Sequence, residues 1–68
     1  MTEETYEQMM KDSDTIFTAI TSGDFPTMKL ARGAIVMCYV PDMSFSRAGI
    51  SHALKRLEEH YRKVGGEV

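Results

Sequence analysis

The sequence contains one cysteine, Cys38, no tryptophan and only two prolines, and each scarcity excludes a class of small protein. One cysteine cannot close an intrachain disulfide, and two histidines, His52 and His60, are little material for a structural zinc site. The absence of repeats excludes collagen-like, solenoid and low-complexity chains. A chain of 68 residues buries only a small core. Self-association is therefore the means of stabilisation that we expect.

Long hydrophobic runs are also absent. The longest, Ala34 to Val40, has seven residues, whereas a membrane-spanning helix needs about 20. The first residues carry neither the basic region nor the apolar region of a secretory signal. We therefore expect a cytoplasmic protein with no membrane partner, in which Cys38 is reduced and behaves as a small apolar residue.

Charge is distributed unevenly along a chain whose net charge is −2. Residues 1–27 carry six acidic side chains and one basic one, whereas residues 28–68 carry seven basic and four acidic side chains. Two interpretations follow. The acidic first segment can pack against the basic last segment, or the basic half can face a phosphate-bearing partner. Hydrophobic residues at 43% and charged residues at 26% are typical of a folded chain in either case.

The first segment, residues 3–22, is predicted to be an amphipathic helix. Its apolar residues recur at steps of three and four, and they are Tyr6, Met9, Met10, Ile16, Phe17 and Ile20. Ser13 interrupts this stripe, and Asp12, Ser13 and Asp14 are all residues that can cap a helix. A kink near Ser13 is therefore left open. Gly23 provides the stop.

The second segment, residues 26–40, is apolar on nearly every side, with Pro26 expected at the first helical position. A strand over residues 34–40 is an alternative, since Ile, Val and Tyr favour strands, but the chain has no second strand-like run to pair with it. A helix of this kind must be covered on nearly every side. Because two neighbouring helices cannot do so, a partner subunit is the simplest cover.

The third segment, residues 46–64, has the clearest helical pattern. Its apolar residues fit the i, i+3, i+4, i+7 template, and they are Ile50, Ala53, Leu54, Leu57, Tyr61 and Val64. Gly65-Gly66 ends it, and Pro41 ends the segment before it. We thus predict an all-α fold of one domain, residues 1–68, with three helices. The last two form an antiparallel hairpin, and the chain assembles as a homo-oligomer.

Nothing in the sequence favours catalysis. His52, Arg56 and His60 lie on one helical strip that we expect to be a solvated edge, and the two histidines are too far apart to share a metal ion. Cys38 lies in an apolar run, unlike a reactive thiolate. There is no calcium-loop spacing and no glycine-rich phosphate loop. We expect a protein that is not an enzyme and that binds no metal or cofactor.

The stretch from Ser44 to Arg47 could form an anion site where the third helix begins, because free backbone N–H groups, hydroxyls and a guanidinium meet there. The alternative is that a serine only caps the helix and Arg47 is solvated. Lys29, in the first turn of the second helix, would meet Arg47 only across a subunit interface, because the two helices run in opposite directions. Tyr6 is either a core edge or a platform for base stacking.

Residues 46–58 resemble the recognition helix of a bacterial helix-turn-helix regulator. In that comparison Ile50 is the inward apolar position, and Leu54 and Leu57 belong to the core. Pro41 falls where the preceding short helix of the motif should be intact. The resemblance implies a DNA-binding regulator whose groove-facing side chains are Ser51, His52, Lys55 and Arg56.

Residues 29–61 contain an apolar helix, a turn and a second helix, and the second helix carries a characteristic run of residues. The matching parts are Leu30-Ala31, Ile35-Val36, Pro41-Asp42, Ser46-Arg47 and the stretch Ser51-His52-Ala53-Leu54-Lys55-Arg56-Leu57-Glu58-Glu59. They resemble the helical hairpin of phage-encoded sponge proteins, which have a Ser-x-Ala-Leu-x-x-Leu-Glu-Glu run. Those proteins defeat cyclic-oligonucleotide (CBASS) immune signalling by sequestering the signal molecule. The turn here is several residues longer, and Ala48 replaces the family's acidic residue.

The sponge resemblance implies a homo-oligomer that binds a cyclic nucleotide signal between subunits without cutting it. Arg47 with Ser46 would hold phosphate, Tyr6 would stack on a base, and Lys29 would add charge. Three hypotheses therefore stand: a nucleotide sponge, a small DNA-binding regulator, and a protein-binding inhibitor of a host factor that takes no small ligand.

Overall fold

The computed structural model describes residues 3–64, and within this range the chain forms three α-helices and no strand. They are α1 (Glu3–Ser22), α2 (Met28–Cys38) and α3 (Arg47–Lys63). The predicted all-α fold with three helices is confirmed. The strand alternative for residues 34–40 is wrong, since α2 continues to Cys38. The predicted stop at Gly65-Gly66 lies outside the described residues.

The first helix, α1, has the predicted bounds and runs through residues 12–15 without a break, so the possible kink is not found. The Thr15 hydroxyl donates a hydrogen bond of 3.0 Å to the Lys11 carbonyl one turn earlier, as Thr21 does to Phe17 at 2.8 Å. Because these hydroxyls bond to carbonyls of the same helix, such polar residues can lie inside a helix and do not have to cap the start of a new one. Gly23 N–H donates to the Ile20 carbonyl where α1 ends.

The second helix, α2, is shorter at both ends than the predicted 26–40. Thr27 is its N-cap, with extended backbone and a side chain that accepts from Leu30 N–H at 3.3 Å, so Pro26 lies outside the helix. At the other end the N–H groups of Tyr39 and Val40 both donate to the Ile35 carbonyl. This shared acceptor ends the regular pattern before Pro41 can do so.

The third helix, α3, begins after the N-cap Ser46, whose hydroxyl accepts from Gly49 N–H at 3.1 Å. Its last turn carries basic side chains, which the negative end of the helix dipole favours. The predicted range of 46–64 is therefore confirmed to within its two capping residues, Ser46 and Val64.

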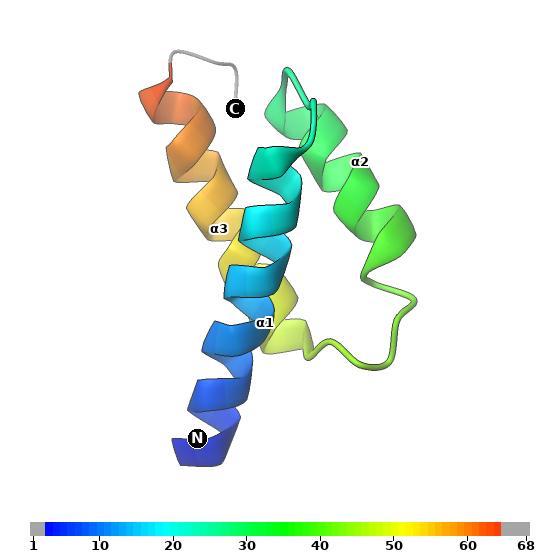
Figure 1. The fold of residues 1–68 in the computed structure, drawn as a ribbon, viewed down its shortest axis with the longest axis vertical. Coiled ribbons are helices and arrows are strands. Elements are labelled where there is room, and N and C mark those ends of the chain that lie inside the picture. Colours follow the sequence, from blue (N-terminus) through cyan, green and yellow to red (C-terminus); the bar gives the residue numbers. More distant parts are fainter. Residues whose placement is uncertain (1–2, 65–68) are drawn as a thin grey trace.

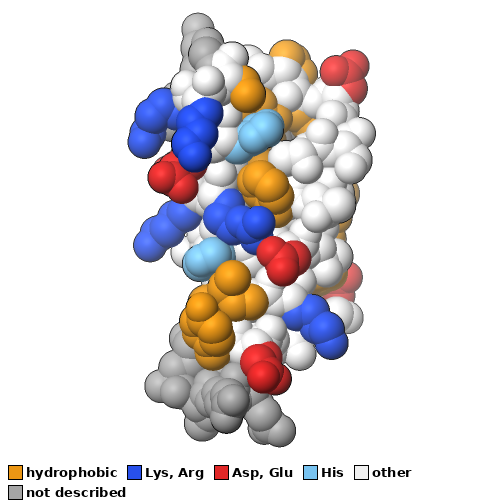
Figure 2. All heavy atoms as spheres, turned by 60° about the vertical axis from the view of Figure 1, so that its left-hand side comes forward, with side chains coloured by type: hydrophobic (Ala, Val, Ile, Leu, Met, Phe, Trp, Pro, Cys, Tyr) orange, Lys and Arg blue, Asp and Glu red, His pale blue; other side chains and the backbone are white. Residues whose placement is uncertain are grey.

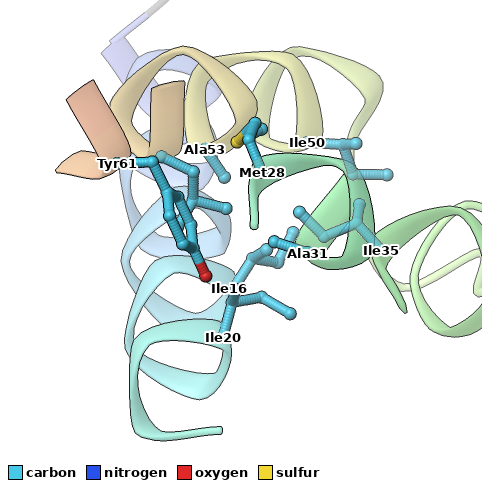
Figure 3. Close-up of a cluster of buried hydrophobic side chains, with 9 residues drawn as sticks. Ile16, Ile20, Met28, Ala31, Ile35, Ile50, Ala53 and Tyr61 are labelled. Atoms are coloured by element: carbon cyan, nitrogen blue, oxygen red, sulfur yellow. The ribbon is translucent and has the colours of Figure 1, made fainter. Parts of the chain in front are cut away.

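The helices pack so that α1 and α3 lie side by side and run in the same direction, while α2 runs in the opposite direction (Figure 1). Loop residues 39–46 connect α2 to α3. All three helices contribute to one buried cluster, which Figure 3 shows in close-up. Its members are Ile16, Ile20, Met28, Ala31, Ile35, Ile50, Ala53, Leu57 and Tyr61.

The apolar surface of α2 is only partly covered. Met28, Ala31 and Ile35 are fully buried against the other helices, whereas Met37 is 80% exposed and Leu30 is 53% exposed. Among residues 3–64, no helix lies on the side of α2 that faces away from α1 and α3 (Figure 1). Two helices cover one face of α2 and leave the opposite face open.

Candidate functional site

The four predicted ligand residues lie at two ends of the molecule. Ser46 and Arg47 are at the start of α3, and Tyr6 is near the start of α1, at the same end (Figure 1). Lys29 is in the first turn of α2, which begins at the opposite end. One chain therefore brings together Ser46 and Arg47 but leaves Lys29 apart from them.

The start of α3 already holds a carboxylate from the same chain. Asp12 on α1 is buried, and its Oδ2 accepts a hydrogen bond of 2.9 Å from Ser46 N–H, while its Oδ1 accepts one of 2.8 Å from Gln8. The Ser46 hydroxyl is itself used as the N-cap. An external phosphate at this helix start would have to compete with Asp12 for the same N–H group.

The environment of Asp12 stabilises its charged form. Burial by itself would raise the pKa of this carboxyl, but the hydrogen bonds from the Ser46 backbone, Gln8 and the Ser46 hydroxyl outweigh burial, with help from the charge of Lys11. The pKa of Asp12 is therefore lowered from its ordinary value. Asp12 is a structural anion that joins α1 to α3.

Arg47 lies at the edge of an apolar groove. The groove has a volume of about 510 Å³ and is lined by Val40, Asp42, Met43, Phe45, Arg47, Ile50, Ser51 and Leu54. Within residues 3–64 no hydrogen bond or ion pair engages the Arg47 side chain, which is exposed. An unpaired guanidinium beside apolar walls suits a ligand with an anionic group on an apolar or aromatic body.

The wall of this groove is held in place by its own contacts. The ring of Phe45 packs edge-on against that of Tyr39, with centroids 4.9 Å apart. Asp42 Oδ1 accepts a hydrogen bond of 2.8 Å from Ser44 N–H, which fixes the turn of the loop. Arg47 and Ser51 are the polar residues on the α3 side of the groove. The loop thus presents a formed surface beside Arg47.

Tyr6 lies outside this groove. It is 53% exposed on α1, and a second, polar hollow of about 540 Å³ near it is lined by Thr5, Glu7, Gln8, Lys11 and Ser46. Tyr6 lines neither hollow. Within one chain, the structure does not bring Tyr6 to the residues around Arg47.

His52, Arg56 and His60 lie along one edge of α3 as expected, but the edge is only partly solvated, because all three face α1 and are half-buried. His52 Nδ1 is 2.9 Å from the hydroxyl of the fully buried Ser13. His60 packs edge-on against the ring of Phe17, with centroids 5.8 Å apart. The serine that interrupts the apolar stripe of α1 was the signal in the sequence that a polar partner lies opposite it.

Arg56 is the centre of this contact. Its Nη1 donates to Ser13 at 3.2 Å and to Asp14 at 2.5 Å, and its guanidinium lies 4.4 Å from the centroid of the Phe17 ring. Figure 2 shows this side of the molecule, where basic, acidic and histidine side chains alternate with hydrophobic ones. The interpretation that acidic residues of the first segment pack against basic residues of the last is confirmed for Asp14 and Arg56.

This contact changes the helix-turn-helix interpretation. Two of its four groove-facing side chains, His52 and Arg56, point at α1. The connection between α2 and α3 spans residues 39–46, whereas the turn of that motif has three or four residues. Ile50 and Leu57 are buried as the resemblance implies, but an amphipathic helix of any function buries such positions.

The other residues that could take part in metal binding or catalysis form no organised site in the described part of the chain. No three His, Cys, Asp or Glu side chains among residues 3–64 are grouped as ligands of a metal ion. Cys38 is a free cysteine, exposed at the end of α2. None of the helices formed by residues 3–64 has the length and hydrophobicity of a membrane span.

Comparison of the chain with known protein families, with curated proteins and with solved structures finds no match.

Proposed function

We propose that this chain is a non-catalytic binding protein that assembles with itself and sequesters a cyclic oligonucleotide or a related nucleotide signal at its subunit interfaces. The observation that carries the proposal is the adjacency of two features. Exposed apolar side chains lie along α2, and Val40, in the loop that follows the helix, is exposed and lines the groove beside the unpaired Arg47.

The apolar surface supports self-assembly. Along α2 and the loop after it, the exposed large apolar side chains are Leu30, Val36, Met37, Val40 and Met43. Burying one such side chain completely contributes about 1.5–3 kcal/mol, and contiguous apolar surface of this kind marks an interaction site. A second copy that covers this face supplies the stabilisation that a 68-residue chain with no possible intrachain disulfide otherwise lacks.

The groove supports an anionic ligand with a flat apolar part. The Arg47 guanidinium can donate two parallel hydrogen bonds to a phosphate, and such charge-assisted bonds are roughly twice as strong as neutral ones. Met43, Phe45 and Leu54 offer apolar surface to a nucleobase, and Ser51 offers a hydroxyl. Recognition of this kind holds a nucleotide without cleaving it, and it requires no nucleophile.

A protein-binding inhibitor is the second candidate, and one observation favours it. On the exposed face of α2, Leu30 and Met37 lie at the i, i+7 spacing that helix-in-groove recognition uses. Under this alternative the face of α2 receives a helix of a host protein, and the Arg47 groove receives an acidic side chain of that protein.

Isothermal titration calorimetry against a panel of cyclic di- and trinucleotides tests the sponge proposal. We expect saturable heat with at least one member, reduced about tenfold or more in affinity by Arg47→Ala. Arg62→Ala is the matched control, because Arg62 is an exposed arginine at the other end of α3. No heat from any panel member, or equal losses in the two variants, would contradict the proposal.

A further inference from the structure

The outward face of α2 has an organised pattern of its own. Met28, Ala31 and Ile35 mark the side of the helix that is buried in the core. At 3.6 residues per turn, the diametrically opposite side carries Gly33 and Met37. With Leu30 they follow the 3-4 spacing of the a/d repeat of helices that pack along a seam, and Val40 follows three residues later in the loop after the C-cap Tyr39. The spacing is that of a helix with a partner on each side.

Gly33 lies at the middle of this outward face, and the described part of its own chain gives no reason for it. A Cβ at position 33 would meet nothing within 4 Å, and the residue sits inside regular helix. A glycine inside a helix costs about 1 kcal/mol relative to alanine. The open space left by the missing side chain, here called the hollow, therefore points to a close approach by something outside the chain.

A second copy fits this hollow by symmetry. If two α2 helices pack antiparallel about a two-fold axis centred at position 35, then Leu30 faces Val40 of the partner subunit and Gly33 faces Met37 of the partner subunit. Met37 is 80% exposed, the most exposed of the large hydrophobic side chains of α2, and Gly33 is the smallest residue possible. A self-complementary surface of this kind is what a two-fold interface requires.

Charges at the two ends of the face also match in the antiparallel arrangement. Lys29 lies in the first turn of α2 and Asp42 lies in the loop just after α2, so the antiparallel arrangement brings Lys29 of the partner subunit to the loop that carries Asp42. No hydrogen bond or ion pair within residues 3–64 engages the Lys29 side chain, and Asp42 has only the Ser44 N–H as a side-chain partner. A parallel arrangement would instead place Lys29 against Lys29 and leave the hollow at Gly33 unfilled.

We infer that the chain dimerises through antiparallel α2 helices, with Met37 of each copy packed over Gly33 of the other. This inference rests on the proposed function for its ligand, and it specifies how the site is completed. The partner's Lys29 joins Asp42 and Arg47, which both line the groove. Each dimer then has two identical anion sites, built from Arg47 of one subunit and Lys29 of the other.

Sedimentation velocity over a range of concentrations, without nucleotide, tests the dimer. Gly33→Met places two bulky side chains against each other and should weaken association by about tenfold or more. Met37→Ala removes the side chain that fills the hollow and should also weaken it. The double variant G33M/M37A exchanges the large and small positions, and association should return to within about threefold of the wild type.

Folding of these variants is checked by circular dichroism. Since a side chain at position 33 meets nothing within the chain, Gly33→Met should keep its helix content. A wild-type chain that stays monomeric at every concentration overturns the inference. A double variant that associates no better than Gly33→Met overturns the antiparallel register.

Cross-linking distinguishes the two orientations in a Cys38→Ser background. A mixture of the Gly33→Cys and Met37→Cys chains should form a mixed disulfide dimer under mild oxidation if the helices are antiparallel. Rapid cross-linking of the Gly33→Cys chain with itself would show the parallel orientation and overturn the inference.

Sedimentation and calorimetry together distinguish a failure of the dimer from a failure of the nucleotide proposal. A nucleotide-free dimer that gives no heat with any cyclic nucleotide keeps the α2 interface and removes the sponge. Nucleotide binding that survives unchanged in the monomeric Gly33→Met variant, or in Lys29→Ala, keeps the sponge and removes the composite site.

Discussion

The carboxylate of Asp12, on α1, accepts a hydrogen bond of 2.9 Å from the backbone N–H of Ser46, the residue immediately before α3. The contact joins two helices across 34 positions of sequence and satisfies a donor that a helix start leaves free. It also places a negative charge at the positive end of the α3 dipole. Asp12 therefore serves α3 in the way that a capping residue of its own sequence would.

Replacing Asp12 should destabilise the fold in a pH-dependent manner. Because its pKa is lower in the folded protein than the ordinary value of 3.8, the contribution of Asp12 is fully present above that value. It is lost as the pH falls through the folded-state pKa. At about pH 7, Asp12→Asn should reduce the free energy of unfolding by about 1–2 kcal/mol.

Urea denaturation of the two proteins between about pH 7 and pH 2.5 measures this difference. The gap between wild type and Asp12→Asn should be constant at neutral pH and should narrow in acid, where the wild-type carboxyl is protonated. Asp24→Asn, a change at an exposed acid between α1 and α2, is the control and should stay within about 0.5 kcal/mol of the wild type. A gap that is independent of pH would show that charge is not the cause.

The two helical glycines, Gly49 and Gly33, should respond oppositely to the same substitution. A Cβ at position 49 would lie 2.5 Å from Asp12 Cβ and 3.2 Å from the Met9 carbonyl oxygen. Neither atom can retreat unless α1 shifts, so Gly49→Ala should cost about 1–3 kcal/mol. At Gly33 nothing within the same chain is near, and in the monomer Gly33→Ala should instead stabilise by up to about 1 kcal/mol.

Thermal melts of the two alanine variants at one low protein concentration provide the measurement. Because each variant is the control for the other, a general effect of removing glycine from a helix would move both melting temperatures upward. That result would mean that α1 and α3 do not approach each other as closely as the Gly49 contacts indicate.

The ranges of α1 and α3 followed from the sequence, since each helix has its own apolar stripe and its own stop or cap. The ends of α2 did not. The rule that a helix ends before proline placed its end at Val40, but the Ile35 carbonyl takes two N–H donors and ends the helix earlier. Likewise, Pro26 fits a first helical position, yet Thr27 captures Leu30 N–H and begins the helix later. Local hydrogen bonds outweighed the preferences of single residues.

The sequence did not predict which residues that are far apart along the chain come into contact. Periodicity showed that Ser13 interrupts an apolar stripe, but not that His52, 39 positions away, lies opposite it. From the sequence, Ser46 could be either a capping residue or a phosphate ligand. Only the structure shows that the backbone N–H of Ser46 already donates to Asp12. Which surface of α2 is left uncovered likewise depends on how α1 and α3 share the other side.

Arg56 and Lys55, neighbours on α3, should differ sharply when each is changed to alanine. Arg56 loses its bonds to Ser13 and Asp14 and its contact with the Phe17 ring, which together should cost about 1–2 kcal/mol. Lys55 is exposed and has no side-chain partner within residues 3–64, so its loss should cost less than about 0.5 kcal/mol.

The same pair of variants tests the helix-turn-helix alternative by fluorescence anisotropy with duplex DNA at several salt concentrations. A DNA-binding α3 would lose affinity and salt dependence in both variants, because both cations would contact phosphate. We expect no salt-dependent duplex binding by the wild type. If the wild type binds duplex DNA with a steep salt dependence and Lys55→Ala reduces it, the DNA-binding regulator replaces the nucleotide sponge as the proposed function.

Tyr61 should stabilise the fold through its hydroxyl as well as its ring. The ring is buried in the core, and the hydroxyl donates a hydrogen bond of 2.6 Å to the Phe25 carbonyl in the turn between α1 and α2. Tyr61→Phe keeps the ring but leaves that carbonyl without this donor, so the free energy of unfolding should fall by about 0.5–1.5 kcal/mol.

Tyr39→Phe is the matched control, because no hydrogen bond engages the Tyr39 hydroxyl in residues 3–64. Hydrogen exchange should also show faster opening of the α1–α2 turn in Tyr61→Phe but not in Tyr39→Phe. Equal stability of the two variants would mean that the hydroxyl of Tyr61 does not hold this turn against α3.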